Sequence, residues 1–194
     1  MTGFLLVGGQ GRRIGGHKPL RPFRGQPLAS IAWDLLAPCS RRIALGRGEL
    51  PSHIGPQWWE EPAGQGPLVA LAWALERSDS EWNAVLAVDY PQLPADLWEQ
   101  LQQQRAPEAL AALPRLNGRM HPLCGLYHRD LAVTLRTAVE RGERSLCRAL
   151  SVLGESVWLE GPWDEECFLN VNQAALLSPA CSNDSGPRPE SPPG

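Results

Sequence analysis

The length and charge of the chain exclude several classes of protein. Its 194 residues fit one ordinary domain, which is long enough to bury a sizeable core. The 18 basic and 21 acidic residues give a net charge of -3, and the sequence has no basic block of the kind that follows a nucleic-acid backbone. We therefore expect neither a nucleic-acid substrate nor a nucleic-acid partner.

The apolar stretches predict a soluble protein that does not enter a membrane. Leu68 to Leu75 and Val85 to Val88 are far shorter than the ~20 apolar residues of a membrane span. Met1 to Leu6 lacks the basic region and cleavage site of a signal peptide, which favours a cytoplasmic location. The five cysteines and four histidines are scattered, so we expect reduced structural thiols and no transition-metal site.

The first half of the chain alternates predicted strands with predicted helices. Continuous apolar runs indicate strands buried on both faces, and apolar residues at helical spacing after a proline indicate helices. Such alternation predicts right-handed βαβ units. The predicted strands are Thr2 to Val7, Arg42 to Leu45, Gln57 to Trp59 and Trp82 to Val88. The predicted helices are Pro27 to Ala37 and a second one that opens at Gly66-Pro67 and carries Leu68, Leu71, Ala72 and Leu75 on one face.

The second half predicts an antiparallel excursion. Asn117-Gly118 favours a tight type I′ turn between the apolar runs Leu110 to Leu113 and Met120 to Tyr127. The expected fold is therefore α/β and three-layered, with a Rossmann-like, mainly parallel sheet and helices on both faces. The remaining expected elements are the helices Arg129 to Arg141 and Ser145 to Leu153, the strand Ser156 to Leu159, and a disordered tail over 178–194.

A glycine-rich stretch, Val7 to Lys18, follows the first predicted strand. Its glycines allow successive backbone N–H groups to turn toward a bound anion. Arg12, Arg13 and Lys18 add positive charge that would stabilise phosphate groups. The stretch therefore predicts a loop that binds the phosphates of a nucleoside triphosphate.

Two other phosphate-binding patterns fit this loop less well. Gly11 and Gly16 have the spacing of a P-loop, but His17 precedes Lys18, and Pro19 stands where a Ser or Thr would ligate magnesium. The Rossmann dinucleotide pattern has one residue fewer, and no acidic residue follows at the end of a convincing second strand. A solvated turn without a ligand is the third alternative.

A series of short motifs extends from this loop along the chain. In order and spacing they resemble the motifs of the MobA-like nucleotidyltransferases, and in particular those of the molybdenum cofactor guanylyltransferases. The resemblance covers Gly3 to about Leu177 and so predicts one domain of this family over 1–177. The motifs are Leu6-Val7-Gly8-Gly9, Arg13-Ile14-Gly15-Gly16, Lys18-Pro19-Leu20, Gly25-Gln26-Pro27-Leu28, Gly66-Pro67-Leu68, Val88-Asp89-Tyr90-Pro91, the segment His121 to Tyr127, and Phe168-Leu169-Asn170-Val171-Asn172.

The resemblance implies a reaction and its substrates. GTP and molybdopterin, or the molybdenum cofactor, would give molybdopterin guanine dinucleotide and pyrophosphate, with Mg²⁺ as cofactor. We expect Asp89 to ligate the magnesium, because a carboxylate at the carboxyl end of a parallel strand lies where such sheets bind ligands. A turn-forming Asp before proline is the structural alternative. Molybdoenzymes or their maturation chaperones are the implied protein partners.

The resemblance also implies two groups of site residues. The first group binds the nucleotide. Its acidic member is Glu60, which stands where the family carries an aspartate, and Glu61 is the alternative for the same role. The second faces the pterin, although Asn172 would equally cap a short helix. The nucleotide group is Leu6, Val7, Gly8, Gly9, Lys18, Glu60 and Asp89, of which Lys18 and Asp89 together with Arg13 are the predicted catalytic residues; the pterin group is Arg119, His121, Asn170 and Asn172.

Some positions depart from the family pattern. His17 replaces an acidic residue, and Gly46 stands where an asparagine often binds the nucleoside. Three alternatives to a guanylyltransferase stay open, and the departures at Glu60 and Gly46 motivate the third of them. The alternatives are a relative that uses CTP on the same cofactor, a nucleotidyltransferase that acts on a sugar phosphate, and a nucleotide-binding partner of molybdoenzyme maturation without catalytic activity.

Overall fold

A computed structural model describes residues 1–7, 18–58, 65–154 and 157–171. Most of the glycine-rich loop and the predicted tail over 178–194 lie outside these described residues. The described part contains every predicted strand and helix in whole or in large part. It also contains the segment after Val88 on which the predicted metal ligand lies.

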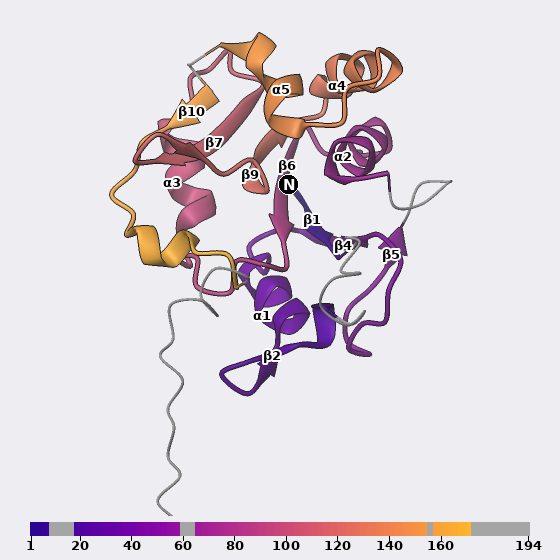
Figure 1. Cartoon of the computed structure of the whole chain (residues 1–194), viewed down its shortest axis with the longest axis vertical. Helices are drawn as coiled ribbons and strands as arrows, with labels where there is room; N and C mark the ends of the chain where they lie inside the picture. The colour runs from indigo at the N-terminus through magenta and orange to yellow at the C-terminus, as the bar shows by residue number, and fades with distance from the viewer. Residues whose placement is uncertain (8–17, 59–64, 155–156, 172–194) are drawn as a thin grey trace, which may run out of the picture.

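An eight-stranded mixed sheet forms the centre of the described part of the chain (Figure 1). Its strands are β1 (Thr2–Leu6), β4 (Arg41–Leu45), β5 (Gln57–Trp58), β6 (Trp82–Ala87), β7 (Ala111–Leu116), β8 (Arg119–Met120), β9 (Cys124–His128) and β10 (Trp158–Leu159). Their order is β10-β7-β9-β6-β1-β4-β5, and β8 pairs with β7. The pairs β6–β1, β1–β4, β4–β5 and β10–β7 are parallel. The strand β9 is antiparallel to both of its neighbours.

Helices cover both faces of the sheet, which confirms the three-layer α/β fold (Figure 1). The helices α2, α4 and α5 pack together on one face, and α1 and α3 lie on the other. The indole Nε1 of Trp98 in α3 donates to the carbonyl of Leu35 at the end of α1, at 2.6 Å. No helix of the described residues is long and apolar enough to cross a membrane. The helices are α1 (Leu28–Leu35), α2 (Pro67–Glu76), α3 (Leu97–Gln104), α4 (Leu131–Glu140) and α5 (Leu146–Leu150), with 3-10 turns η1 (Lys18–Leu20), η2 (Ser151–Leu153) and η4 (Glu165–Phe168) and a separate two-stranded ribbon of β2 (Pro22–Phe23) and β3 (Gln26–Pro27).

The apolar runs form the central strands as predicted. Every residue of β1 is buried, and so is every residue of β6 after Trp82. This burial pattern is typical of parallel strands covered by helices on both faces. The helix α2 begins at Pro67, and a proline is favoured at the first position of a helix. Gly66, with a φ of 102°, turns the chain into the helix in a conformation that glycine adopts without strain.

The antiparallel excursion is also present, with one refinement. Asn117 and Gly118 have φ values of 48° and 75° and connect β7 to β8, as a type I′ turn requires. The predicted run Met120 to Tyr127 divides into the end of β8 and most of β9, and each piece pairs with a different part of β7. Pro122 interrupts the run, because it has no N–H for a ladder.

The helix α3 was not predicted from the sequence. Its sequence, LWEQLQQQ, contains three glutamines near its end and little apolar periodicity. Leu97, Trp98 and Leu101 nevertheless share one buried face, which packs on β7 and β9. Leu97 and Leu101 are four residues apart, and this spacing is the sign of a helix face that the sequence offers.

Four of the cysteines lie among the described residues, and all four are free thiols. Burial raises the pKa of Cys39 to about 11 and the pKa of Cys124 well above its usual value. A thiol that stays protonated at neutral pH is a poor nucleophile. Cys39 and Cys124 therefore act as small core residues, as expected.

Gly125 lies in β9 at a point where the sheet leaves no room for a side chain. A Cβ at this position would lie 2.5 Å from Leu113 Cδ2 and 3.0 Å from the carbonyl oxygen of Ala112. We predict that Gly125→Ala lowers the free energy of unfolding by about 1–3 kcal/mol, measured by denaturant titration. Gly48→Ala is the matched control, because a Cβ there meets nothing within 4 Å. Equal stability of the two variants would contradict this account of the packing.

Candidate active site

Three parallel strands end side by side at one edge of the sheet. The backbone N–H of Val88 donates to the carbonyl of Leu6 at 3.4 Å, and the N–H of Val7 donates to the carbonyl of Leu45 at 2.9 Å. These bonds hold the carboxyl ends of β6, β1 and β4 together. Ligands of open α/β sheets bind outside this edge. Asp89 comes directly after this edge, at the end of the β6 segment.

Asp89 and Lys18 form an ion pair at this edge. The Lys18 Nζ lies 2.6 Å from Oδ1 and 2.6 Å from Oδ2 of Asp89. Their side chains are 29% and 15% exposed, so water screens the pair less than it would on an open surface. The pair draws together residues that are distant in sequence, and it fixes the ammonium group at the carboxyl edge of the sheet.

Asn170 is the second partner of the Asp89 carboxylate. Its Nδ2 donates to Oδ2 at 3.1 Å, and the backbone N–H of Val171 donates to the Asp89 carbonyl at 3.1 Å. The other oxygen, Oδ1, is buried and has no partner with hydrogen-bond geometry among the described residues, although the Lys18 ammonium lies close to it. Asp89 thus retains acceptor capacity toward the site.

The local sequence explains how Lys18 and Asn170 reach this point. Lys18 begins the turn η1, in which Pro19 is buried, and its carbonyl accepts from the N–H of Arg21 at 3.2 Å. Asn170 follows η4, whose last residue, Phe168, is 1% exposed. Buried residues beside each polar group therefore anchor the two segments.

Gln92 connects the segments that border the site. Its Oε1 accepts from Arg24 at 3.2 Å, and its Nε2 donates to the carbonyl of Glu166 at 3.4 Å. It therefore links the turn between β2 and β3 to η4. Gln92 was not among the predicted site residues, because a lone glutamine after Pro91 belongs to no recognisable motif.

His121 is buried between two aromatic rings beside the site. Its ring centroid lies 6.0 Å from that of Tyr90 and 5.0 Å from that of Phe168. The side chain is 3% exposed, and Nδ1 is buried without a hydrogen-bond partner among the described residues. Burial, and then the charge of Arg119, lower the pKa of His121 to about 4, against the opposing effect of Glu165. His121 is neutral at physiological pH.

The structure brings together part of the predicted site. Lys18 and Asn170 each contact Asp89, whereas His121 is buried beside Tyr90 and Arg119 is exposed on β8. Leu6 and Val7 lie at the adjoining strand end and are 6% exposed each. Their roles toward ligands remain predictions. Arg13, Gly8, Gly9, Glu60 and Asn172 lie outside the described residues.

Asp89 fits the donor chemistry of a magnesium ion. Mg²⁺ is commonly held by one or two carboxylates together with substrate phosphates. Asp89 supplies one carboxylate whose buried Oδ1 has no partner with hydrogen-bond geometry among the described residues, although the Lys18 ammonium lies 2.6 Å from it. The described residues contain no group of three or more His, Cys, Asp or Glu side chains that could hold a metal ion. A magnesium ion here would have Asp89 as one ligand.

Comparison with known proteins identifies the family of the chain. The model of the MobA-like NTP transferase domain matches residues 3–155. The chain belongs to this family. The chain is thus a nucleotidyltransferase.

Two relatives and one solved structure of this family illustrate the similarity. A probable molybdenum cofactor guanylyltransferase of Synechococcus elongatus is 33% identical over 153 residues, which cover 72% of this chain and 78% of that protein. The molybdenum cofactor guanylyltransferase of Serratia proteamaculans is 32% identical over 160 residues, which cover 79% and 81%. The crystal structure of molybdopterin-guanine dinucleotide biosynthesis protein A from Archaeoglobus fulgidus superposes with a TM-score of 0.73 at 25% identity and covers 89% and 92%.

The buried His121 predicts a pH dependence of stability. Its folded pKa of about 4 lies below the ordinary value of 6.5, so between these values the unfolded chain binds more protons. The free energy of unfolding should therefore rise with pH across this window, by up to about 3 kcal/mol from this residue. His121→Phe should flatten that rise relative to wild type in urea titrations at pH 4 to 7, whereas His53→Gln, at an exposed position, should leave it unchanged. Parallel curves for wild type and His121→Phe would contradict this assignment.

Proposed function

We propose that the protein transfers GMP from GTP to molybdopterin and releases pyrophosphate. The ion pair of Lys18 and Asp89 at the carboxyl edge of the sheet is the observation that carries the proposal. It supplies an ammonium group for phosphate and a carboxylate for a cation at the place where open α/β sheets bind ligands. Family membership, and relatives named as molybdenum cofactor guanylyltransferases, support this choice of substrates.

The proposed reaction needs no nucleophile from the protein. An oxygen of the terminal phosphate of molybdopterin attacks the α-phosphorus of GTP, and the bond from that phosphorus to the bridging oxygen of the β-phosphate breaks. The products are molybdopterin guanine dinucleotide and pyrophosphate. Reactions of this kind depend on positioning and on stabilisation of phosphate charge, which are the tasks that Lys18 can perform.

Each site residue has a proposed task in this reaction. Lys18 stabilises the negative charge that develops on the phosphate oxygens, and Asp89 holds the ammonium group of Lys18 in place before the substrate arrives. Asn170 fixes the orientation of the carboxylate through its bond to Oδ2. Arg119 on the exposed hairpin supplies positive charge toward the pterin phosphate, and His121 contributes a neutral ring beneath that side of the site.

Magnesium is the proposed cofactor, with Asp89 as its protein ligand. A magnesium ion bound there would offset the charge of the nucleotide phosphates. The buried Pro19 anchors η1 and so keeps the Lys18 ammonium group at this edge of the sheet.

The activity can be tested directly with purified protein. Incubation with GTP, Mg²⁺ and molybdopterin should release pyrophosphate and form the dinucleotide. Asp89→Asn, which keeps the size of the side chain, should slow turnover by roughly a hundred- to a thousandfold, as removal of a transition-state electrostatic contact does. Asp34→Asn, on the exposed side of α1, is the matched control and should retain the wild-type rate. Full activity of Asp89→Asn would remove this carboxylate from the mechanism.

The choice of nucleotide can be tested by thermal unfolding. With Mg²⁺ present, GTP should raise the midpoint of unfolding, while CTP, ATP and UTP at the same concentration should raise it less. A ligand at a hundred times its Kd stabilises the folded state by about 2.7 kcal/mol. Lys18→Met should weaken the effect of GTP, because the phosphates lose their cation. A larger shift with CTP would favour the cytidylyl alternative, and stabilisation by GTP without pyrophosphate release would favour a non-catalytic partner.

A further inference from the structure

A cavity lies at the opposite end of β6 from Asp89. It has a volume of about 540 Å³, and Glu81, Trp82, Arg105, Glu108, Leu110 and His128 are among its lining residues. Trp82 is the first residue of β6, so the length of the strand separates this cavity from Asp89 by roughly 20 Å. We call it the Trp82 pocket. It shares no lining residue with the candidate active site.

Arg105 in this pocket has an unusual environment. Its guanidinium carbon lies 4.3 Å from the centre of the Trp82 ring, and its Nε is buried without a hydrogen-bond partner among the described residues. A buried donor without a partner is costly, because it has lost its water. The other stacked arginines of the described chain each have a polar partner: Arg24 has Gln92, Arg41 has Asp79, Arg42 has the carbonyl of Trp33, and Arg77 has the carbonyl of Trp73.

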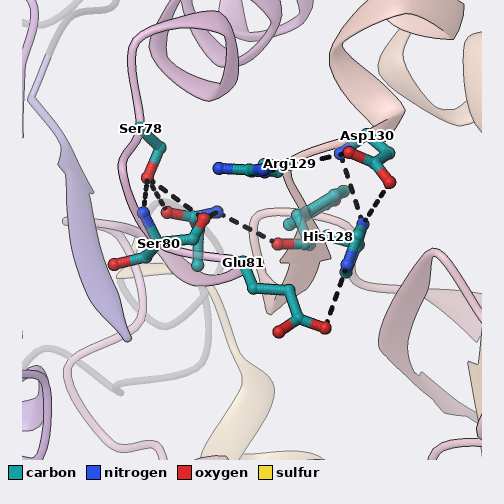
Figure 2. A network of polar contacts seen from close by, with 8 residues as sticks. Ser78, Ser80, Glu81, His128, Arg129 and Asp130 are labelled. Atoms are coloured by element: carbon teal, nitrogen blue, oxygen red, sulfur yellow. Dashed lines mark hydrogen bonds and ion pairs between the residues drawn. The ribbon is translucent and has the colours of Figure 1, made fainter.

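The opposite wall of the pocket is preorganised by His128. Figure 2 shows the His128 ring between two carboxylates, with Glu81 on one side and Asp130 on the other. The Glu81 Oε1 lies 3.3 Å from Nε2, and the Asp130 Oδ2 lies 3.5 Å from Nδ1. The ring also meets Trp82 edge to face at 5.2 Å. These contacts hold the tryptophan between the histidine and Arg105.

The charges around the pocket restrict what it can bind. Arg105 offers donors for a carboxylate, but Glu81 and Glu108 place negative charge on the same lining. A simple anion would therefore be attracted by one group and repelled by two others. A molecule with both an anionic and a cationic end satisfies all three. The apolar surfaces of Trp82 and Leu110 suit a hydrocarbon group on that molecule.

We propose that the Trp82 pocket binds a small zwitterion of the α-amino-acid type with an apolar side chain. Its carboxylate accepts hydrogen bonds from the terminal guanidinium nitrogens of Arg105, which lines the pocket. Its ammonium group faces Glu81 and Glu108, and its side chain packs on Trp82. The cavity volume lies within the range of small-molecule sites. This site is independent of the proposed transfer reaction.

Three related probes can test the two charges separately. L-phenylalanine carries both charges, N-acetylphenylalanine lacks the ammonium, and phenylalaninamide lacks the carboxylate. In ¹⁵N NMR titrations, L-phenylalanine should shift the Arg105 Nε–H signal in a saturable way. We expect each of the other two probes to bind at least about tenfold more weakly, because each leaves a charged group of the pocket unpaired. No saturable shift with L-phenylalanine, or equal affinity for all three probes, would overturn the proposal.

Two arginine variants provide the matched comparison. Arg105→Met should lose the preference for L-phenylalanine over phenylalaninamide. Arg77→Met should keep it, because Arg77 also stacks on a tryptophan, at 4.2 Å, but lies outside this pocket. Thermal unfolding of both variants shows whether they are folded. If a variant does not fold, the comparison of the three probes on the wild-type protein still tests the proposal. Unchanged discrimination in folded Arg105→Met would overturn the assignment of the carboxylate to Arg105.

Discussion

The contact of Lys18 with Asp89 is the interaction on which the candidate site depends. It joins the last residue of the glycine-rich stretch to the second residue after the central strand β6. Neither group would hold its position alone, because a lysine side chain is flexible and a partly buried carboxylate is unstable without a counter-charge. The surrounding structure serves this contact: β1 and β6 set the edge, and Asn170 orients the acid.

The sequence was sufficient for much of the fold because the central strands are buried on both faces. Continuous apolar runs identify β1 and β6, and the position of Asp89 after β6 followed from them. The type I′ turn at Asn117-Gly118 could also be predicted, since both residues tolerate positive φ. The helix α3 was missed, because its glutamines conceal a narrow apolar face that only its packing on β7 and β9 reveals.

Contacts between distant segments set the limit of sequence reasoning at the site. The burial of His121 between Tyr90 and Phe168 depends on side-chain packing across three segments, which spacing does not encode. The bridge made by Gln92 has the same origin. Asn170 was assigned to the pterin side by resemblance, whereas in the structure its amide also bonds to the Asp89 carboxylate.

The bond from the Val171 N–H to the Asp89 carbonyl has a consequence for synthesis on the ribosome. All strands of the central sheet except β10 are complete by His128, so most of the scaffold can form while the rest of the chain is still being made. The partner that orients the acid emerges more than a hundred residues after β1. A nascent chain can therefore form most of its sheet before the Asn170 amide is available to orient the Asp89 carboxylate.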